Sequence, residues 1–188
     1  MDLREAVARL ATIDGSLILV DQFLNHRVDP DVMRSLGQHL AKRLAPRQPG
    51  LILTAEASGI PPALACALEL GLPMVYAKKF LGTGNRYSFS REVVSPTKGI
   101  EYRVEVSRKM LDPGTRVAIV DDFLSGGRTA AALGQIAEEA GCDVVGFAFA
   151  IEKAFLGGRA RLEDHGWHID SIVRVLSIEG GVIEIDDD

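Results

Sequence analysis

The sequence predicts an α/β fold, with a doubly wound and mainly parallel sheet, in a single domain over residues 1–188. Short apolar runs of strand length alternate with helical patterns through the middle of the chain. One segment, 116–130, passes from an apolar run through two acids and a glycine turn into a helical pattern. With 188 residues and 47% hydrophobic residues, the chain is large and apolar enough for one buried core.

Helical elements are predicted from apolar stripes and from residues that begin or end helices. Leu3, Ala6, Val7 and Leu10 share one face of a short helix over 2–12. Asp29 is placed to cap a helix that has Pro30 in its first turn and stops at Pro46. Further helices are predicted over 60–70, opened by two prolines and closed by a glycine, and over about 127–140.

Strands are predicted where short apolar runs lie between turn signals. In chain order they are 17–20, 51–54, 74–77, 117–120, 144–151, 169–175 and 182–185. The runs at 51–54 and 117–120 are almost wholly apolar, as expected for parallel strands covered on both faces. Residues 80–107 carry glycine, serine and basic residues between β-branched pieces, so we expect a mobile hairpin or a long loop there.

The composition excludes several classes of protein. A net charge of −5 offers no overall basic field for nucleic acid. The two cysteines, Cys66 and Cys142, are too few for a disulfide framework and indicate a reducing, cytoplasmic home. The first five residues include two acids, unlike a signal peptide, and no run of about 18 apolar residues predicts a membrane span.

The segment from Arg116 to Ala130 carries the chemistry. Asp121 and Asp122, at the end of a buried strand, can accept hydrogen bonds from vicinal hydroxyls or hold hydrated Mg²⁺. The turn Ser125–Gly127 allows backbone N–H groups to converge, and the helix N-terminus behind it favours an anion. Acids for a sugar beside amides for a phosphate match a ribose 5-phosphate.

A plainer interpretation is that the two aspartates cap a turn and Ser125 caps a helix. That interpretation explains each residue separately, but not their order. The spacing is neither a Walker A motif, because the final Gly-Lys-Ser/Thr is absent, nor Gly-x-Gly-x-x-Gly. The ordered combination therefore favours a ligand site.

Val-Asp-Asp-Phe-Leu-Ser-Gly-Gly-Arg-Thr, residues 120–129, resembles the phosphoribosyl-diphosphate (PRPP) signature of the type I phosphoribosyltransferases. Three further segments resemble the bacterial xanthine phosphoribosyltransferases, so the resemblance runs from about residue 17 to 178. These segments are Phe23–His26 with Asp29-Pro30, Glu56–Ile60, and Ile151–Phe155. One departure is the phosphate loop, where the xanthine branch often has Ala-Asn-Gly-Gln/Lys-Ala and this chain has Ser-Gly-Gly-Arg-Thr.

The resemblance implies roles for matching positions. Asp121 and Asp122 would bind the ribose hydroxyls of PRPP, with Mg²⁺ held through PRPP rather than directly by the protein. The PRPP loops would consist of Ser125, Gly126, Gly127, Arg128 and Thr129 for the 5-phosphate and Ala57, Ser58 and Gly59 for the diphosphate, the latter often with a non-proline cis peptide. Residues 80–107 would be a flexible hood loop beside a small hood from the N- and C-terminal segments, and the enzyme would be a homodimer.

At the purine base the resemblance implies Ile18, Asn25 and Lys153. A cationic lysine suits xanthine, which has two carbonyl oxygens and ionises readily, better than it suits adenine. Alternatives stay open for each residue: Ile18 in the core, Asn25 in a turn, and Lys153 on the surface paired with Glu152. Basic residues such as Lys98, Arg103 or Arg108 are candidates for the diphosphate, in this or a neighbouring subunit.

The predicted function is therefore transfer of the 5-phosphoribosyl group from PRPP to xanthine. The alternatives are the same chemistry with adenine, hypoxanthine or guanine, and a non-catalytic PRPP-sensing regulator. A regulator of that kind needs a DNA-binding module, and the acidic balance and lack of a helix-turn-helix pattern before the first core strand argue against one.

Overall fold

The computed structural model describes residues 1–15, 17–81, 87–94 and 101–186. Its α-helices are α1 (Leu3–Leu10), α2 (Pro30–Leu44), α3 (Ile60–Leu70), α4 (Arg128–Glu139) and α5 (Gly158–Glu163). Its strands are β1 (Thr12–Asp14), β2 (Leu17–Leu19), β3 (Leu51–Ala55), β4 (Met74–Phe80), β5 (Ser88–Val94), β6 (Glu101–Ser107), β7 (Arg116–Leu124), β8 (Asp143–Lys153), β9 (Ile169–Glu179) and β10 (Val182–Ile185).

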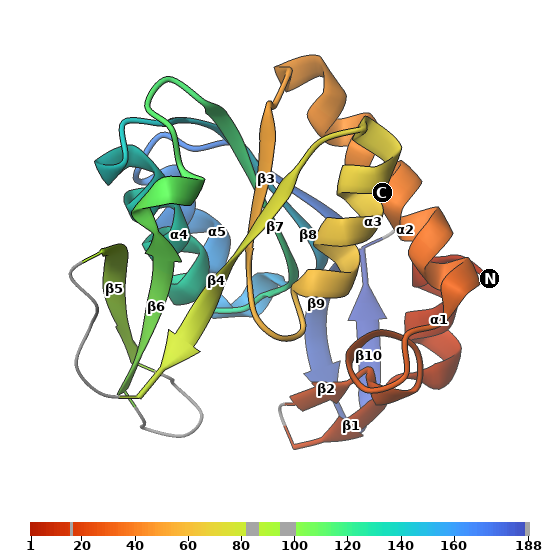
Figure 1. Cartoon of the computed structure of the whole chain (residues 1–188). Helices are drawn as coiled ribbons and strands as arrows, with labels where there is room; N and C mark the ends of the chain where they lie inside the picture. The colour runs from red at the N-terminus through yellow and green to blue at the C-terminus, as the bar shows by residue number, and fades with distance from the viewer. Residues whose placement is uncertain (16, 82–86, 95–100, 187–188) are drawn as a thin grey trace.

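An eight-stranded sheet in the order β10-β9-β8-β7-β3-β4-β6-β5 forms the centre of the molecule (Figure 1). The five strands from β9 to β4 run parallel, and β10, β6 and β5 pair antiparallel at the two sides. From β3 the chain moves outward to β4 and later returns to β7 on the other side. Neighbouring strands β3 and β7 therefore mark a switch point, where open α/β sheets bind ligands. The predicted fold class is confirmed.

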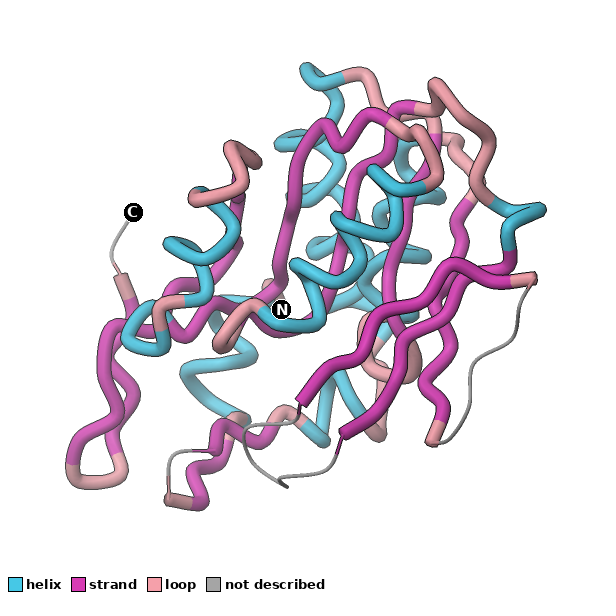
Figure 2. The backbone as a smooth tube through the Cα atoms, turned by 90° about the vertical axis from the view of Figure 1, so that its left-hand side faces the viewer, coloured by secondary structure: helices cyan, strands magenta, loops and turns pink. Residues whose placement is uncertain are grey.

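Apolar layers cover both faces of the sheet, and Figure 2 shows helices on either side of the strands. One layer packs α4 and Trp167 against Leu53, Ile119 and Phe147. The other packs α1, α2 and α3 against Ile52 and Val120. Because alternate residues of β3 and β7 enter opposite layers, these strands need apolar residues at successive positions, and β3 is buried throughout.

The predicted helices form within one or two residues of their expected ends. The Asp29 carboxylate accepts hydrogen bonds from the N–H groups of Asp31 (3.0 Å) and Val32 (3.2 Å), which confirms it as the cap of α2. Helix α5 was not predicted, because six residues are too few for an apolar stripe. Strand β7 also runs four residues beyond its predicted end, so Asp121 and Asp122 lie within the strand.

Residues 80–107 are a hairpin rather than a long loop, as far as the structure describes them. Strands β5 and β6 pair antiparallel from Ser88↔Ser107 to Val94↔Glu101, and β6 joins the main sheet through β4. Phe89, Val93, Val104 and Val106 belong to the same apolar layer as α4. The expectation of a mobile loop concerns residues 82–86 and 95–100 as well, which lie outside the described residues.

Two further hairpins come from the ends of the chain. Strands β1 and β2 pair antiparallel, as do β9 and β10, and both hairpins lie in the lower part of Figure 1. Ile18 of β2 and Ile178 and Ile183 of the second hairpin belong to the apolar layer that contains α1. This arrangement corresponds to the small hood expected from the terminal segments.

Both cysteines are buried thiols. Cys66 and Cys142 are free, as the sequence predicts, and burial raises the pKa of Cys66 to about 12, with a smaller effect from Glu69. Such a thiol stays protonated and inert at neutral pH. Over the part of the chain that the structure describes, no helix is long and apolar enough to cross a membrane.

Candidate functional site

The segment after β3 lies directly against the acids of β7. A Cβ atom at Gly59 would collide with Oδ1 of Asp121 and with Oγ1 of Thr54, and would come within 2.9 Å of the carbonyl oxygen of Ala55. Only glycine fits this contact without movement of β3 or β7. The peptide bond Glu56–Ala57 is cis, as the family resemblance implies. The sequence-predicted diphosphate loop and acid pair thus meet at the switch point.

Asp121 and Asp122 are both buried, at 8% exposure each. The N–H of Asp122 donates to Oδ1 of Asp121 at 3.0 Å. Burial raises the pKa of Asp121 well above its ordinary value, the neighbouring charge of Asp122 raises it further, and the charge of Lys79 opposes this shift. A buried carboxyl pair of this kind favours a ligand that brings hydroxyl donors or positive charge.

The predicted phosphate loop, Ser125–Thr129, connects β7 to α4, and its backbone lies close to the first residue of α5. Gly127 has φ +72°, and a Cβ there would come within 2.8 Å of the carbonyl oxygen of Gly158. Nε of Arg161 donates to the carbonyl oxygen of Gly126 at 2.8 Å. Within the described chain, no side chain caps α4, so Ser125 is not its cap. The N–H groups of the first turn of α4 are thus left for an anion.

One cavity brings most of the predicted PRPP residues together. Its lining includes Ser58, Asp121, Asp122, Ser125, Gly126, Gly127, Arg128 and Thr129. It also includes Lys79, Val93, Val94, Tyr102, Phe123, Leu124 and Ala130, which the sequence analysis did not assign. Ala57 and Gly59 are not in this lining, although both flank Ser58.

The hairpin β5–β6 is tied to the phosphate loop by hydrogen bonds. The hydroxyls of Tyr102 and Thr129 lie 2.7 Å apart, and either can donate. Nη1 of Arg128 donates to the carbonyl oxygen of Val94 at 3.1 Å. Nζ of Lys79 lies 5.5 Å from the centre of the Tyr102 ring. Lys79 could have been found from its position near the end of a strand beside the switch point; the Tyr102–Thr129 contact spans 27 residues and has no local signal.

The basic hairpin residues proposed from the sequence lie elsewhere. Nη2 of Arg103 pairs with Glu92 at 2.8 Å, and the Arg108 guanidinium lies 4.2 Å from the centre of the Phe89 ring. Neither lines the cavity that holds the acids, while Lys98 lies outside the described residues. Among the described residues of that lining, the cations are Lys79 and Arg128.

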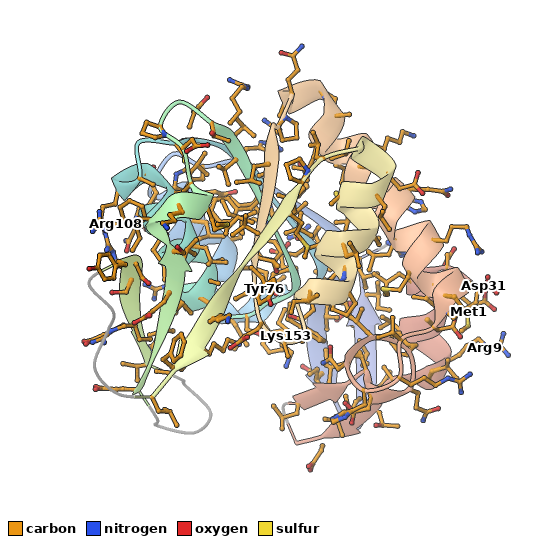
Figure 3. The ribbon with its side chains drawn as sticks, in the orientation of Figure 1. Met1, Arg9, Asp31, Tyr76, Arg108 and Lys153 are labelled. Carbon is orange, nitrogen blue, oxygen red and sulfur yellow. The ribbon has the colours of Figure 1, made fainter. Side chains whose placement is uncertain are left out.

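Lys153, the last residue of β8, is a buried lysine. It is 7% exposed, its Nζ lies 5.6 Å from the centre of the Phe123 ring, and burial lowers its pKa. Figure 3 shows it in the lower middle of the view, at the carboxyl end of β8. Lys153 is not among the residues that line the acid cavity, and the Phe123 ring, which does line it, connects the lysine to that cavity. The alternative of a surface lysine is wrong.

The neighbouring Glu152 is also buried, and its carboxylate contacts residues of α5 and β9. Its carboxylate accepts from Nε of Arg159 at 2.9 Å, from Nη2 of Arg159 at 2.6 Å and from Oγ of Ser171 at 2.7 Å. Burial alone would raise its pKa, but the hydrogen bonds of Arg159 and Ser171 and the charges of Arg159 and Arg174 outweigh burial and lower it. This network was not predicted, since Arg159 lies in the missed helix α5.

The two remaining base candidates lie in the N-terminal hood. Ile18, implied by the resemblance at the base, is 6% exposed and packs in the apolar layer with α1, as its core alternative describes. Asn25 is exposed and ends a π-helical turn, Asp21–Asn25, whose N–H groups return to the carbonyl oxygen of Val20. Neither residue is among those lining the acid cavity.

The resemblance implies Mg²⁺ held through PRPP, and the donor set at the acid pair also fits an ion shared between the protein and a phosphate-bearing substrate. Asp121 and Asp122 are hard oxygen donors, and no group of three or more His, Cys, Asp or Glu residues is gathered within the described residues. Mg²⁺ commonly takes one or two carboxylates and completes its shell with water and phosphate oxygens. The chain thus offers the kind of partial site that a phosphate-bearing substrate completes.

Comparisons with known proteins agree with this geometry. A family model described as the phosphoribosyl transferase domain matches residues 20–184. A xanthine phosphoribosyltransferase of Chloroflexus aurantiacus is 46% identical over 90% of this chain and 80% of its own. That of Shouchella clausii is 41% identical over 97% of this chain and 92% of its own.

Solved structures agree as well. A crystal structure of adenine phosphoribosyltransferase from Thermoanaerobacter pseudethanolicus has a TM-score of 0.78 and 28% identity over 92% of this chain and 99% of its own. The enzyme of the same name from Rhodothermus marinus has a TM-score of 0.77 and 23% identity over 92% and 98%. The match of the family model over most of the chain confirms the resemblance found in the sequence. The chain belongs to the phosphoribosyl transferase family and is a phosphoribosyltransferase.

Proposed function

We propose that the chain transfers the 5-phosphoribosyl group from PRPP to xanthine, giving xanthosine 5′-monophosphate and diphosphate. The observation that carries the proposal is the cavity in which Asp121, Asp122 and Ser58 meet the Ser125–Thr129 loop. Two relatives that bear the name xanthine phosphoribosyltransferase, 46% and 41% identical, support the choice of base. The buried Lys153, whose ammonium lies 5.6 Å from the centre of a ring that lines this cavity, supports it independently.

We expect each part of PRPP to bind a different segment of the chain. Asp121 and Asp122 accept hydrogen bonds from the ribose hydroxyls. The loop Ser125, Gly126, Gly127, Arg128 and Thr129 holds the 5-phosphate by backbone N–H groups at the start of α4. Ala57, Ser58 and Gly59 hold the diphosphate, with the charge of Lys79, which lines the same cavity as Ser58, to assist them.

The reaction is a displacement at the anomeric carbon of ribose. A ring nitrogen of the base forms the new C–N bond, the C–O bond to diphosphate breaks, and its electron pair leaves with the diphosphate. The protein holds both reactants in line and stabilises the charge on the departing group with backbone amides and Lys79. Mg²⁺, if held with PRPP near Asp121 and Asp122, would neutralise further charge on the departing group. Tyr102 and Arg128 attach the hairpin to the phosphate loop, which helps to exclude water.

At the base, Lys153 donates to an oxygen of xanthine or to its anion, and Asn25 and Ile18 complete the pocket from the N-terminal hood. Xanthine has two carbonyl oxygens and ionises readily, so it gains more from a buried cation than adenine does. Burial lowers the pKa of Lys153, so its ammonium is partly desolvated, and a carbonyl oxygen or an anion of the base would add a favourable contact there.

Adenine is the second candidate base. Two solved structures with a similar fold bear the name adenine phosphoribosyltransferase, at 28% and 23% identity. The relatives named for xanthine are more similar in sequence, at 46% and 41% identity. Adenine, which carries an amine at position 6, also gains less from a cationic lysine than xanthine does. Incubation with PRPP, Mg²⁺ and each of four purine bases separates the candidates: xanthosine monophosphate supports the proposal, and adenosine monophosphate overturns the choice of base.

The protein is further proposed to act as a cytoplasmic homodimer. Two free, buried cysteines suit a reducing compartment. Tyr76, Phe80 and Met110, each about half exposed, line a second, mainly apolar hollow on β4 and β6, which suits contact with another copy. Light scattering on the purified protein tests the dimer: a monomer at assay concentration would contradict it.

A further inference from the structure

The carboxylate of Glu152 occupies the centre of a network at the end of β8. Besides Arg159 and Ser171, Arg174 approaches, with its Nε 3.5 Å from Oε2 of Glu152. The Glu152 side chain is 2% exposed, whereas its two arginine partners keep 28% and 39%. A buried carboxylate is tolerated only with such partners, so Glu152 fixes their positions as much as they fix its own.

The partners come from different elements. Arg159 belongs to α5, and Ser171 and Arg174 belong to β9. Arg159 also donates from Nη1 to the carbonyl oxygen of Ile169 at 2.9 Å. The network therefore attaches the last part of β8 to the strand beside it and to the helix that follows it.

Lys153 is the next residue after Glu152 and the last one of β8. Successive side chains of a strand point to opposite sides. While Glu152 reaches α5 and β9, the ammonium of Lys153 lies near the ring of Phe123 on β7. A carboxylate anchored one residue away restricts the movement of the Lys153 backbone and so the reach of its ammonium.

We propose that Glu152 is a positioning residue for the base, holding Lys153 in place through its hydrogen bonds with Arg159 and Ser171. The inference rests on the proposed role of Lys153 at the purine. Glu152 itself does not contact the substrate; it acts only through the lysine beside it. A misplaced donor loses affinity for the group that it should meet, even when the fold is intact.

The test is a double-mutant cycle on the purified enzyme, with the KM for xanthine and the KM for PRPP measured separately. Glu152→Gln keeps the shape of the side chain and removes its charge. Arg159→Lys keeps the charge of the partner and removes its two-pronged contact. We expect each to raise the KM for xanthine about tenfold, with the KM for PRPP changed less than about twofold. Ser171→Ala, a milder change, should give a smaller rise and serves if Glu152→Gln does not fold.

The decisive comparison is made in a Lys153→Ala background. If Glu152 acts through Lys153, adding Glu152→Gln to Lys153→Ala produces no further rise in the KM for xanthine. Arg116→Ala is the matched control, since Arg116 also pairs with an acid (Asp143, 2.9 Å) and donates to two backbone carbonyls, at the opposite end of β7. It should lower the melting temperature and leave both KM values unchanged.

Additive effects of Glu152→Gln and Lys153→Ala, or equal rises in both KM values, would overturn the inference and leave Glu152 as a structural residue. Failure of the proposed function has a different signature. It would be seen in the wild-type enzyme as the absence of xanthosine monophosphate, or in Lys153→Ala as an unchanged KM for xanthine; either result overturns the positioning role as well.

Discussion

Gly59 lies against Asp121 so closely that any side chain at position 59 would overlap the Oδ1 atom of the aspartate. The contact joins the loop after β3 to the acid pair of β7, across the switch point between these two parallel strands. Because Oγ1 of Thr54 approaches the same point, the glycine is enclosed from two strands. The distance between the proposed diphosphate loop and the ribose acids is thus set by the absence of a Cβ atom.

Gly59→Ala is therefore expected to abolish most activity and to lower the free energy of unfolding by about 1–3 kcal/mol, since β3 and β7 must separate. Urea denaturation and PRPP-dependent nucleotide synthesis measure the two effects. Gly50→Ala is the control, because a Cβ there would meet only the carbonyl oxygen of Arg116 at 3.8 Å. Full activity in Gly59→Ala would show that the loop does not need this close approach.

Asp121→Asn is expected to inactivate the enzyme while stabilising the fold at neutral pH by about 1 kcal/mol. Burial and the charge of Asp122 raise the pKa of Asp121 in the folded state, so folding favours its protonated form. That contribution to stability is present at acid pH and is lost as the pH rises through the folded-state pKa. Denaturation at pH 5 and pH 8 should show a smaller pH dependence in Asp121→Asn than in the wild type. Equal dependence in both would contradict the assignment.

Lys79 and Lys78 form a matched pair of neighbouring lysines on β4. Lys79 lines the acid cavity, and Lys78 lines the apolar hollow with Tyr76 and Phe80. Lys79→Ala should raise the KM for PRPP about tenfold through the lost charge near the diphosphate. Lys78→Ala should leave it within about twofold. Steady-state kinetics at saturating base separates the two, and the reverse order would place the diphosphate on the other side of β4.

The alkaline limb of the pH profile should report Lys153. Burial lowers its pKa, so the ammonium loses its proton at a lower pH than an exposed lysine does. The kcat/KM for xanthine should fall as the pH rises through that value. In Lys153→Arg, whose guanidinium stays charged, the limb should move to higher pH, while ionisation of xanthine affects both enzymes equally. A limb at the same pH in both proteins would show that another group titrates.

Local patterns in the sequence were sufficient for the core of the fold. The apolar runs of β3 and β7 and the Asp29 cap of α2 act over a few residues, and each formed as expected. For the hairpin β5–β6 the sequence allows either a hairpin or a long loop, because burial along β6 does not alternate and depends on packing in the layer with α4. Its place in the sheet depends on tertiary contacts.

The same distinction between local patterns and tertiary contacts applies to the candidate site. The PRPP segment was visible because strand, acids, glycine turn and helix follow one another within 15 residues. Tyr102 and Lys79 were missed, since each reaches the cavity from a distant part of the chain. Arg159 was missed because it lies in α5, which is too short to show an apolar stripe. The burial of Lys153 could not be predicted from its neighbours either. An adjacent glutamate suggests an exposed ion pair, whereas the Glu152 carboxylate accepts hydrogen bonds from Arg159 and Ser171.

The most direct test of the central claim is a competition among bases. Purified protein, PRPP and Mg²⁺ are mixed with equal concentrations of xanthine, guanine, hypoxanthine and adenine, and the nucleotide products are separated by chromatography. We expect xanthosine monophosphate to dominate, to be lost in Asp122→Asn, and to make up a smaller share of the product in Lys153→Ala. Dominant adenosine monophosphate would contradict the choice of base. PRPP binding without any nucleotide product would contradict the claim that the protein catalyses phosphoribosyl transfer to a purine.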